Sequence, residues 1–179
     1  MAWLSRRRRD PRVDLVAELV RAYYRVYGRP LRGAARVAAL LAALAYLNPE
    51  NGAARSKPLR LGISFYLDPA AGLIVSDEVR TLLEEAADEG LVSIRSETCY
   101  ETVPELCDSP PYTYAYAPGR KKPNVRNGRL TKLIEAVVRR FGAMDPRIIA
   151  RMVLDALGVK KSTLHHVYHP IPLEELAAA

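Results

Sequence analysis

Glutamine is absent from this chain of 179 residues, and histidine, methionine, cysteine and tryptophan are scarce. Arginine is abundant by contrast, with 21 arginines against six lysines. Few thermolabile amides and many charged side chains are typical of proteins from hot environments, although arginine enrichment is the weaker part of that signal. We therefore expect the chain to come from a hyperthermophile.

Only two cysteines occur, Cys99 and Cys107, and they flank a short loop. Thiols in a mesophile cytosol usually stay reduced, whereas intracellular disulfides are a real exception among hyperthermophiles. A bridge would close a short loop and contribute about 2–3 kcal/mol to stability. The pattern leaves a Cys99–Cys107 disulfide and a pair of free thiols equally open.

No secretory leader or membrane span is evident. Met1–Leu4 is too short for the apolar part of a signal peptide before the arginines that follow. The apolar run at 37–47 is far too short to cross a bilayer. We expect a cytoplasmic protein without membrane contact.

Fingerprints of enzymes are also missing. The chain contains neither GxGxxG nor a P-loop, and it lacks the regular strand–helix alternation of a parallel α/β sheet. All three histidines, His165, His166 and His169, fall within five residues. Two imidazoles at helical spacing can hold a metal, but no third ligand is evident, so we interpret them as a surface segment. Neither cysteine has a neighbouring histidine as base. We expect no catalysis, cofactor or metal.

Apolar spacing predicts an α+β fold, mainly helical, with about five helices and a small antiparallel sheet. We expect helices at 11–28, 34–47, 76–89, 130–142 and 145–158, and strands at 59–67, 92 to about 103, and 112–117. A flexible basic arm (1–12) and a C-terminal tail (159–179) flank a single domain (13–158) that ends in a helical pair. The helix and two-stranded hairpin at 76–117 have the layout of a winged helix-turn-helix, so we expect a winged-helix-like domain.

The helix at 76–89 has the wrong charge for its usual role. In a winged helix it would enter the DNA major groove. Here Glu84, Glu85, Asp88 and further acidic residues oppose a single Arg80. Carboxylates set against phosphates repel them at the short Debye length of cell salt. A solvated acidic face is our first interpretation, and a face for a basic protein partner is the alternative.

The net charge of +7 and an isoelectric point near 9.6 indicate an anionic partner. We favour nucleic acid as that partner over a membrane surface. We expect phosphate contacts from the arm and from a linker at 119–129, and base stacking by tyrosines on one strand face. The alternative for the arm is a solubilising tail, and the alternative for the tyrosines is a strand face directed at the core. The candidate residues are Arg6, Arg7, Arg8, Arg9, Arg12, Arg120, Lys121, Lys122, Asn124, Arg126, Asn127, Arg129, Tyr112, Tyr114 and Tyr116. The leading hypothesis is a non-enzymatic nucleic-acid-binding protein, a transcriptional regulator that binds DNA rather than RNA.

The order of elements over 35–157 resembles the Panacea or SocA-like antitoxin domain and the related YwgA-like proteins. Those pair a "LLYLxD"-type helix with a "YGPYS"-type turn, a helix and a "GLI" strand. The matching segments here are Ala45-Tyr-Leu-Asn48, Leu61-Gly-Ile-Ser-Phe-Tyr-Leu67, Val75-Ser-Asp-Glu-Val-Arg-Thr-Leu-Leu83 and Asp88-Glu-Gly-Leu-Val92. The turn at 68–72 and the long loop at 99–111 depart from this pattern. The resemblance implies recognition of a cognate protein, such as a toxin, without catalysis, through Glu84, Glu85 and Asp88. The sequence also leaves open whether the protein forms a homodimer.

Overall fold

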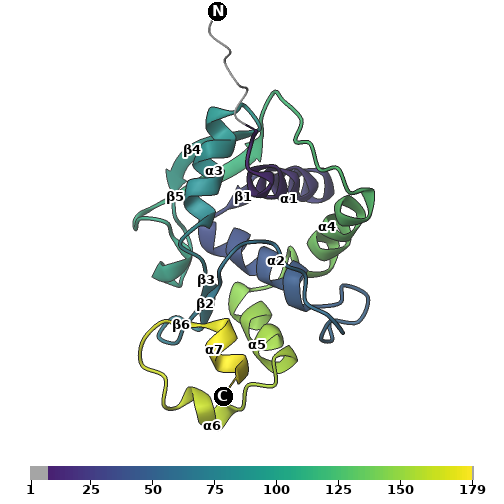
Figure 1. Ribbon diagram of the computed structural model, residues 1–179. Coiled ribbons are helices and arrows are strands. Elements are labelled where there is room, and N and C mark those ends of the chain that lie inside the picture. Colours follow the sequence, from purple (N-terminus) through teal and green to yellow (C-terminus); the bar gives the residue numbers. More distant parts are fainter. Residues whose placement is uncertain (1–7, 179) are drawn as a thin grey trace, which may run out of the picture.

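The computed structural model describes residues 8–178 of the chain (Figure 1). Its elements are α1 (Pro11–Tyr27), β1 (Leu31–Arg32), α2 (Ala34–Tyr46), β2 (Tyr66–Asp68), β3 (Leu73–Val75), α3 (Val79–Asp88), β4 (Val92–Thr98), the 3-10 helix η1 (Pro104–Leu106), β5 (Tyr112–Pro118), α4 (Gly128–Phe141), α5 (Pro146–Ala156), α6 (Lys161–Leu164), β6 (Ile171–Pro172) and α7 (Leu173–Ala178). This arrangement confirms the expected α+β class. The five expected helices are the five longest, and the α4–α5 helical pair lies where the sequence predicts it.

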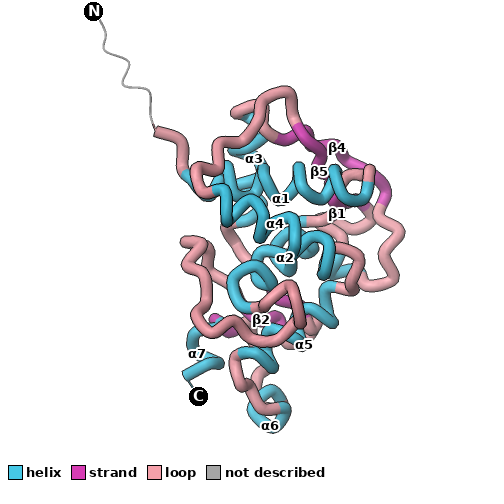
Figure 2. The backbone as a smooth tube through the Cα atoms, turned by 90° about the vertical axis from the view of Figure 1, so that its right-hand side faces the viewer, coloured by secondary structure: helices cyan, strands magenta, loops and turns pink. Residues whose placement is uncertain are grey.

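α2 is the central helix of the molecule. Every residue from Val37 to Ala45 is buried, because an apolar helix has no face that favours water. It packs against α5 and β3 on one side and against α3 and α4 on the other. Figure 2 shows α2 between an upper group that contains α1 and α4 and a lower group that contains α5 and α7.

The upper sheet has the strand order β1-β5-β4, and both strand pairs are antiparallel. β4 and β5 form a hairpin that runs from Val92 opposite Pro118 to Thr98 opposite Tyr112. β4 ends at Thr98 rather than near residue 103 as expected. The amide of Cys99 still donates to the carbonyl of Pro111 at 2.7 Å, but Pro110 and Pro111 have no amide hydrogen with which to continue the pairing.

The strand predicted at 59–67 is mostly not a strand. Only Tyr66–Asp68 pairs with a neighbour. The alternation that suggested a strand is real, since Leu61 and Ile63 are half-buried while Gly62 and Ser64 are exposed. However, Gly62 has a φ of 72°, which interrupts an extended backbone. Alternating burial here reflects an irregular segment lying on the core.

α3 begins three residues later than the predicted helix. Its N-cap position is Glu78, which makes no side-chain capping bond. Ser76 Oγ instead accepts from the amide of Glu78 at 3.3 Å, just before the helix. By contrast, α5 begins within one residue of the helix expected at 145–158. Asp145 is its N-cap, and the Asp145 carboxylate accepts from the amide of Arg147.

A second sheet, absent from the prediction, has the order β3-β2-β6. Its third strand comes from the segment expected to be a separate tail. The amide of Leu173 donates to the carbonyl of Phe65 at 3.0 Å, and Leu173 and Leu176 are buried. Leu173 and Leu176 therefore belong to the core of the domain, and the segment at 171–176 packs on its own chain. Within the part of the chain that the structure describes, no helix combines the length and apolarity needed to cross a membrane.

Candidate functional site

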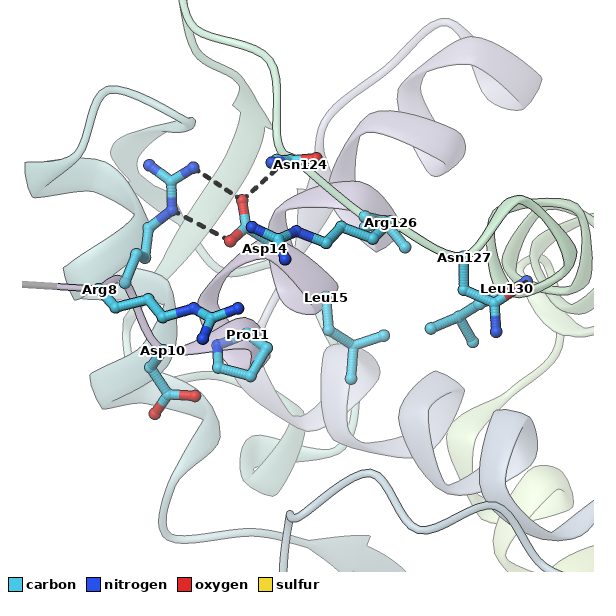
Figure 3. A pocket seen from close by; sticks show the side chains of 11 residues that line it. Arg8, Asp10, Pro11, Asp14, Leu15, Asn124, Arg126, Asn127 and Leu130 are labelled. Carbon is cyan, nitrogen blue, oxygen red and sulfur yellow. Dashed lines mark hydrogen bonds and ion pairs between the residues drawn. The ribbon is translucent and has the colours of Figure 1, made fainter.

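A groove lies where the end of the N-terminal arm meets the linker between β5 and α4. We call it the N-terminal groove; its volume is about 630 Å³. Figure 3 shows residues of the arm and of α1 on one side, and residues of the linker and of α4 on the other. The lining residues are Arg8, Arg9, Asp10, Pro11, Asp14, Leu15, Asn124, Val125, Arg126, Asn127 and Leu130. The structure thus brings together the two basic segments that the sequence places more than 100 residues apart.

Asp14 joins the two sides of this groove. Its carboxylate accepts from Arg9 Nε at 3.0 Å and from the amide of Asn124 at 2.8 Å. Arg9 Nη2 lies 3.0 Å from the same carboxylate, whose side chain is only 9% exposed. A buried carboxylate requires such partners, because an unpaired buried charge is costly. These bonds fix the linker against the first turn of α1.

Asp10, the second acidic residue of the groove, is also neutralised. It caps α1 by accepting from the amide of Arg12 at 2.9 Å, and its carboxylate lies 2.7 Å from Arg12 Nη2. The hydrogen bond from the Arg12 guanidinium holds the pKa of Asp10 below its usual value. Asp10 and Asp14, the two carboxylates of the groove, therefore each have an arginine partner.

The linker keeps its own cations exposed. We call residues 119–129 the basic segment. Within residues 8–178, its five cationic side chains form no ion pair, and all five residues are exposed. They are Arg120, Lys121, Lys122, Arg126 and Arg129. Arg8 is likewise exposed and forms no ion pair in that range. Figure 3 shows Arg8 and Arg126 directed into the groove from its two sides.

The basic segment is anchored at both ends. The amide of Gly119 donates to the carbonyl of Leu91 at 2.9 Å, and that of Lys121 donates to the carbonyl of Gly90 at 3.0 Å. A β-carbon at position 119 would collide with the Gly90 carbonyl, so glycine is needed there. At the other end Asn127 caps α4 by accepting from the amides of Arg129 and Leu130. With the Asn124 bond between them, these anchors fix the backbone that carries the five cationic side chains.

The N-terminal arm only partly fulfils its predicted role. Arg6 and Arg7 lie outside the described residues. Arg9 bridges Asp14 and Glu89, and the hydrogen bond that it donates to the Asp14 carboxylate raises the pKa of Arg9. Arg12 pairs with Asp10 and lies 3.5 Å from Glu78. Arg9 and Arg12 are therefore engaged by carboxylates of the same chain, and their contact with phosphate stays a prediction. Arg8 is the arginine of the described part of the arm that forms no ion pair within residues 8–178.

The three tyrosines of β5 differ in exposure. Tyr112 is 56% exposed, Tyr114 is half-buried beneath the Arg80 guanidinium, and Tyr116 is only 1% exposed. Tyr116 lies in the central strand, opposite Leu31 and Ile94, and burial raises the pKa of its phenol. The prediction that Tyr116 stacks on a base is therefore wrong, because its ring does not reach solvent.

At the hairpin tip Cys99 and Cys107 form a disulfide with a Cα–Cα distance of 5.9 Å. Next to it lies Asp108, a residue that sequence reasoning missed. Its side chain is 1% exposed and accepts from the amide of Ala34, the amide of Tyr114 and the hydroxyl of Thr113. One signal could have found it: Gly33 precedes α2 and has no side chain to cap that helix.

The other sequence candidates lie elsewhere. Glu84, Glu85 and Asp88 are exposed on α3 and form no ion pair within residues 8–178. The residues His165, His166 and His169 are exposed after α6. Among the described residues no three histidine, cysteine, aspartate or glutamate side chains lie close enough together to hold a metal ion.

Comparison with known proteins adds no relative to this description. No protein-family model, no curated protein and no solved structure matches the chain. The groove and the basic segment must therefore be interpreted from their own chemistry.

Proposed function

We propose that this protein binds nucleic acid without catalysing a reaction, and that it acts as a transcriptional regulator with a winged-helix-like fold. The observation that carries the proposal is the basic segment. Its five exposed cations form no ion pair within residues 8–178, and its backbone is fixed by hydrogen bonds. Cations left unpaired on a preorganised surface can neutralise phosphates and release their counterions, which is the main source of affinity for nucleic acid.

The arrangement of α3 and the β4–β5 hairpin supports the winged-helix part of the proposal. The usual mode of such a fold places the helix in the major groove. Here α3 presents Glu84, Glu85 and Asp88 to solvent. At the hairpin tip, Glu97 and Glu101 pair with Arg32 and Arg36, so the tip offers few free cations. We therefore assign nucleic-acid contact to the basic segment and Arg8, and not to α3.

The test is the triple variant Lys121→Ala/Lys122→Ala/Arg126→Ala. Affinity for a short DNA duplex, the matching single strand and the RNA equivalent is measured by fluorescence anisotropy over a range of salt concentrations. We expect affinity at low salt to fall at least about tenfold, and the slope of log K against log salt to lose about two to three units. The comparison of DNA with RNA decides the preferred polymer.

A matched control removes the same net charge elsewhere. Lys57, Arg60 and Lys160 are exposed and form no ion pair within the described range. Their triple alanine variant is expected to retain most of the affinity and the slope. An equal loss of affinity in both triple variants would show that only the overall charge matters. A wild-type protein that shows no salt-dependent binding of nucleic acid would refute the proposal.

A second candidate function is favoured by the exposed acidic face of α3. In this reading, which follows the SocA-like resemblance, Glu84, Glu85 and Asp88 bind a cognate basic protein. A pull-down from native extract should return one stoichiometric protein, and Glu84→Lys/Glu85→Lys should abolish its capture. The double variant Glu50→Lys/Glu105→Lys changes the net charge equally at two other exposed positions and should still capture the partner.

A further inference from the structure

We propose that the N-terminal groove holds one unpaired nucleotide of a nucleic-acid strand, with its phosphate on Arg8 and Arg126 and its base against an apolar wall. This inference rests on the proposed function and names the part of the polymer that the site recognises. It turns on three properties of the groove: its size, the state of its charges and the apolar residues between them.

The size of the groove suits a small ligand and not the side of a helix. Its volume of about 630 Å³ falls within the range of roughly 300–1,000 Å³ usual for small-molecule sites. A duplex presents a convex surface with its bases stacked inside. A concave site of this size is filled only by a group that leaves the stack, as an unpaired nucleotide does.

The charges of the groove leave two guanidinium groups free. Asp14 is satisfied by Arg9 and by the amide of Asn124, and Asp10 by Arg12. Arg8 and Arg126 have no carboxylate partner within residues 8–178 and reach in from opposite sides (Figure 3). The planar guanidinium fork matches phosphate oxygens bidentately. A backbone phosphodiester between the two arginines would offset one of their two positive charges.

The space between these arginines is lined by apolar side chains. Pro11 and Leu15 come from α1, Val125 from the basic segment and Leu130 from α4. Figure 3 shows Leu15 and Leu130 directed toward each other across the groove. A purely phosphate-binding surface has no use for such a wall, whereas the face of a nucleobase is apolar and packs on it.

Two amides at the rim can bind the edge of that base. The side-chain oxygen of Asn127 caps α4, whereas its amide nitrogen donates no hydrogen bond to any residue between 8 and 178. Asn124 bonds Asp14 through its backbone, which leaves its exposed side chain free in the same way. Both donors would meet the carbonyl oxygens and ring nitrogens of a base.

The experiment compares probes that differ only in the base. A deoxythymidine oligomer and an oligomer of the same length with abasic residues carry equal charge, so phosphate contacts bind both alike. We expect the full-length protein to prefer the base-containing oligomer about five- to tenfold. Thymidine monophosphate and inorganic phosphate are titrated in parallel, to separate a nucleotide within a strand from a free ligand.

Two sets of variants locate the effect. Arg8→Ala/Arg126→Ala should weaken binding of both oligomers. Val125→Ser should leave binding of the abasic oligomer unchanged and bring the ratio of the two oligomer affinities close to one. The control Val103→Ser, at a half-buried position in the hairpin loop, should keep the wild-type ratio. Thermal melting verifies that each variant folds. If Val125→Ser fails to fold, amide chemical shifts of Leu15, Val125 and Leu130 in the wild-type protein provide the same test, since only the base-containing oligomer should perturb them.

The outcomes separate this inference from the proposed function. Equal, salt-dependent binding of both oligomers overturns the nucleotide site and leaves the function standing. A preference that survives Val125→Ser with unperturbed groove amides places the base elsewhere and also overturns it. If the protein binds thymidine monophosphate but neither oligomer, or binds no probe at all, both the nucleotide site and the proposed function are overturned.

Discussion

The carboxylate of Asp108 accepts a hydrogen bond of 3.0 Å from the amide of Ala34, a residue 74 positions earlier in the chain. Ala34 is the first residue of α2, and the preceding Gly33 provides no cap of its own. Arg80 of α3 lies 3.2 Å from the same carboxylate. One side chain in the hairpin loop therefore links the central helix, α3 and β5.

Replacing Asp108 with alanine is the first prediction. The amides of Ala34 and Tyr114 and the hydroxyl of Thr113 would lose their acceptor in a buried place. We expect the free energy of unfolding to fall by about 3–5 kcal/mol, measured by urea denaturation. Glu105→Ala, at an exposed position of the same loop, should change it by less than about 0.5 kcal/mol. A loss below about 1 kcal/mol for Asp108→Ala would contradict the linking role.

The second prediction concerns the disulfide. Reducing the Cys99–Cys107 bridge removes a constraint from the unfolded chain, and we expect it to lower the free energy of unfolding by about 2–3 kcal/mol. Denaturation with and without dithiothreitol measures this difference. The Cys99→Ser/Cys107→Ser variant should match the reduced protein and ignore the reductant. Indifference of the wild type to reduction would show that the bridge contributes nothing.

The third prediction separates two adjacent arginines. Arg9→Ala leaves the carboxylate of Asp14, which is 9% exposed, without its guanidinium, so stability should fall by about 1–3 kcal/mol. Arg8→Ala should change stability by less than about 0.5 kcal/mol, because Arg8 is exposed and forms no ion pair within residues 8–178. Nucleic-acid affinity, compared at equal folded fraction, should fall more for Arg8→Ala than for Arg9→Ala. Identical behaviour of the two variants would remove this division of roles.

The fourth prediction follows from the tyrosines of β5. Tyr116→Ala should cost about 3–5 kcal/mol of stability, since it empties a fully buried site in the core. Tyr112→Ala, at a 56% exposed position, should cost less than about 1 kcal/mol. Thermal and chemical unfolding provide both values. A mild effect at position 116 would be inconsistent with its burial.

The fifth prediction is a pH dependence. The hydrogen bond from Arg147 lowers the pKa of Asp145, the N-cap of α5, below its usual 3.8. A depressed folded-state pKa stabilises the protein above the unfolded value, and that contribution is lost as pH falls through the folded one. Asp145→Asn keeps the cap but loses the charge, so the wild type should be the more stable at pH 7, by a margin that narrows below about pH 4. Asp155→Asn, at an exposed position, is the control.

Local signals in the sequence were enough to predict most helices. Apolar spacing places α1 and α4 within two residues, and the Asp145-Pro146 pair marks the start of α5. Such features depend on neighbours three or four positions away. The failures come from longer range. Alternation at 59–65 looks like a strand until Gly62 and the missing partner are seen.

The candidate site was predicted only in its parts. Basic composition singles out the segment at 119–129, but nothing local shows that Asp14 bonds Asn124 across 110 residues and so forms a groove. The same holds for Arg9 and Tyr116, whose side chains suit phosphates and bases in isolation. Burial and internal carboxylates, which are properties of the folded chain, assign them to structure.

The short strand β6 also protects the molecule against a common hazard of small sheets. An unpaired sheet edge can recruit a strand from another chain and begin aggregation. Pro172 is half of β6 and lies opposite Tyr66. Because proline has no amide hydrogen to donate, this edge offers an incomplete template. Exchanging Pro172 for a β-branched residue would give this edge the backbone donor that it lacks.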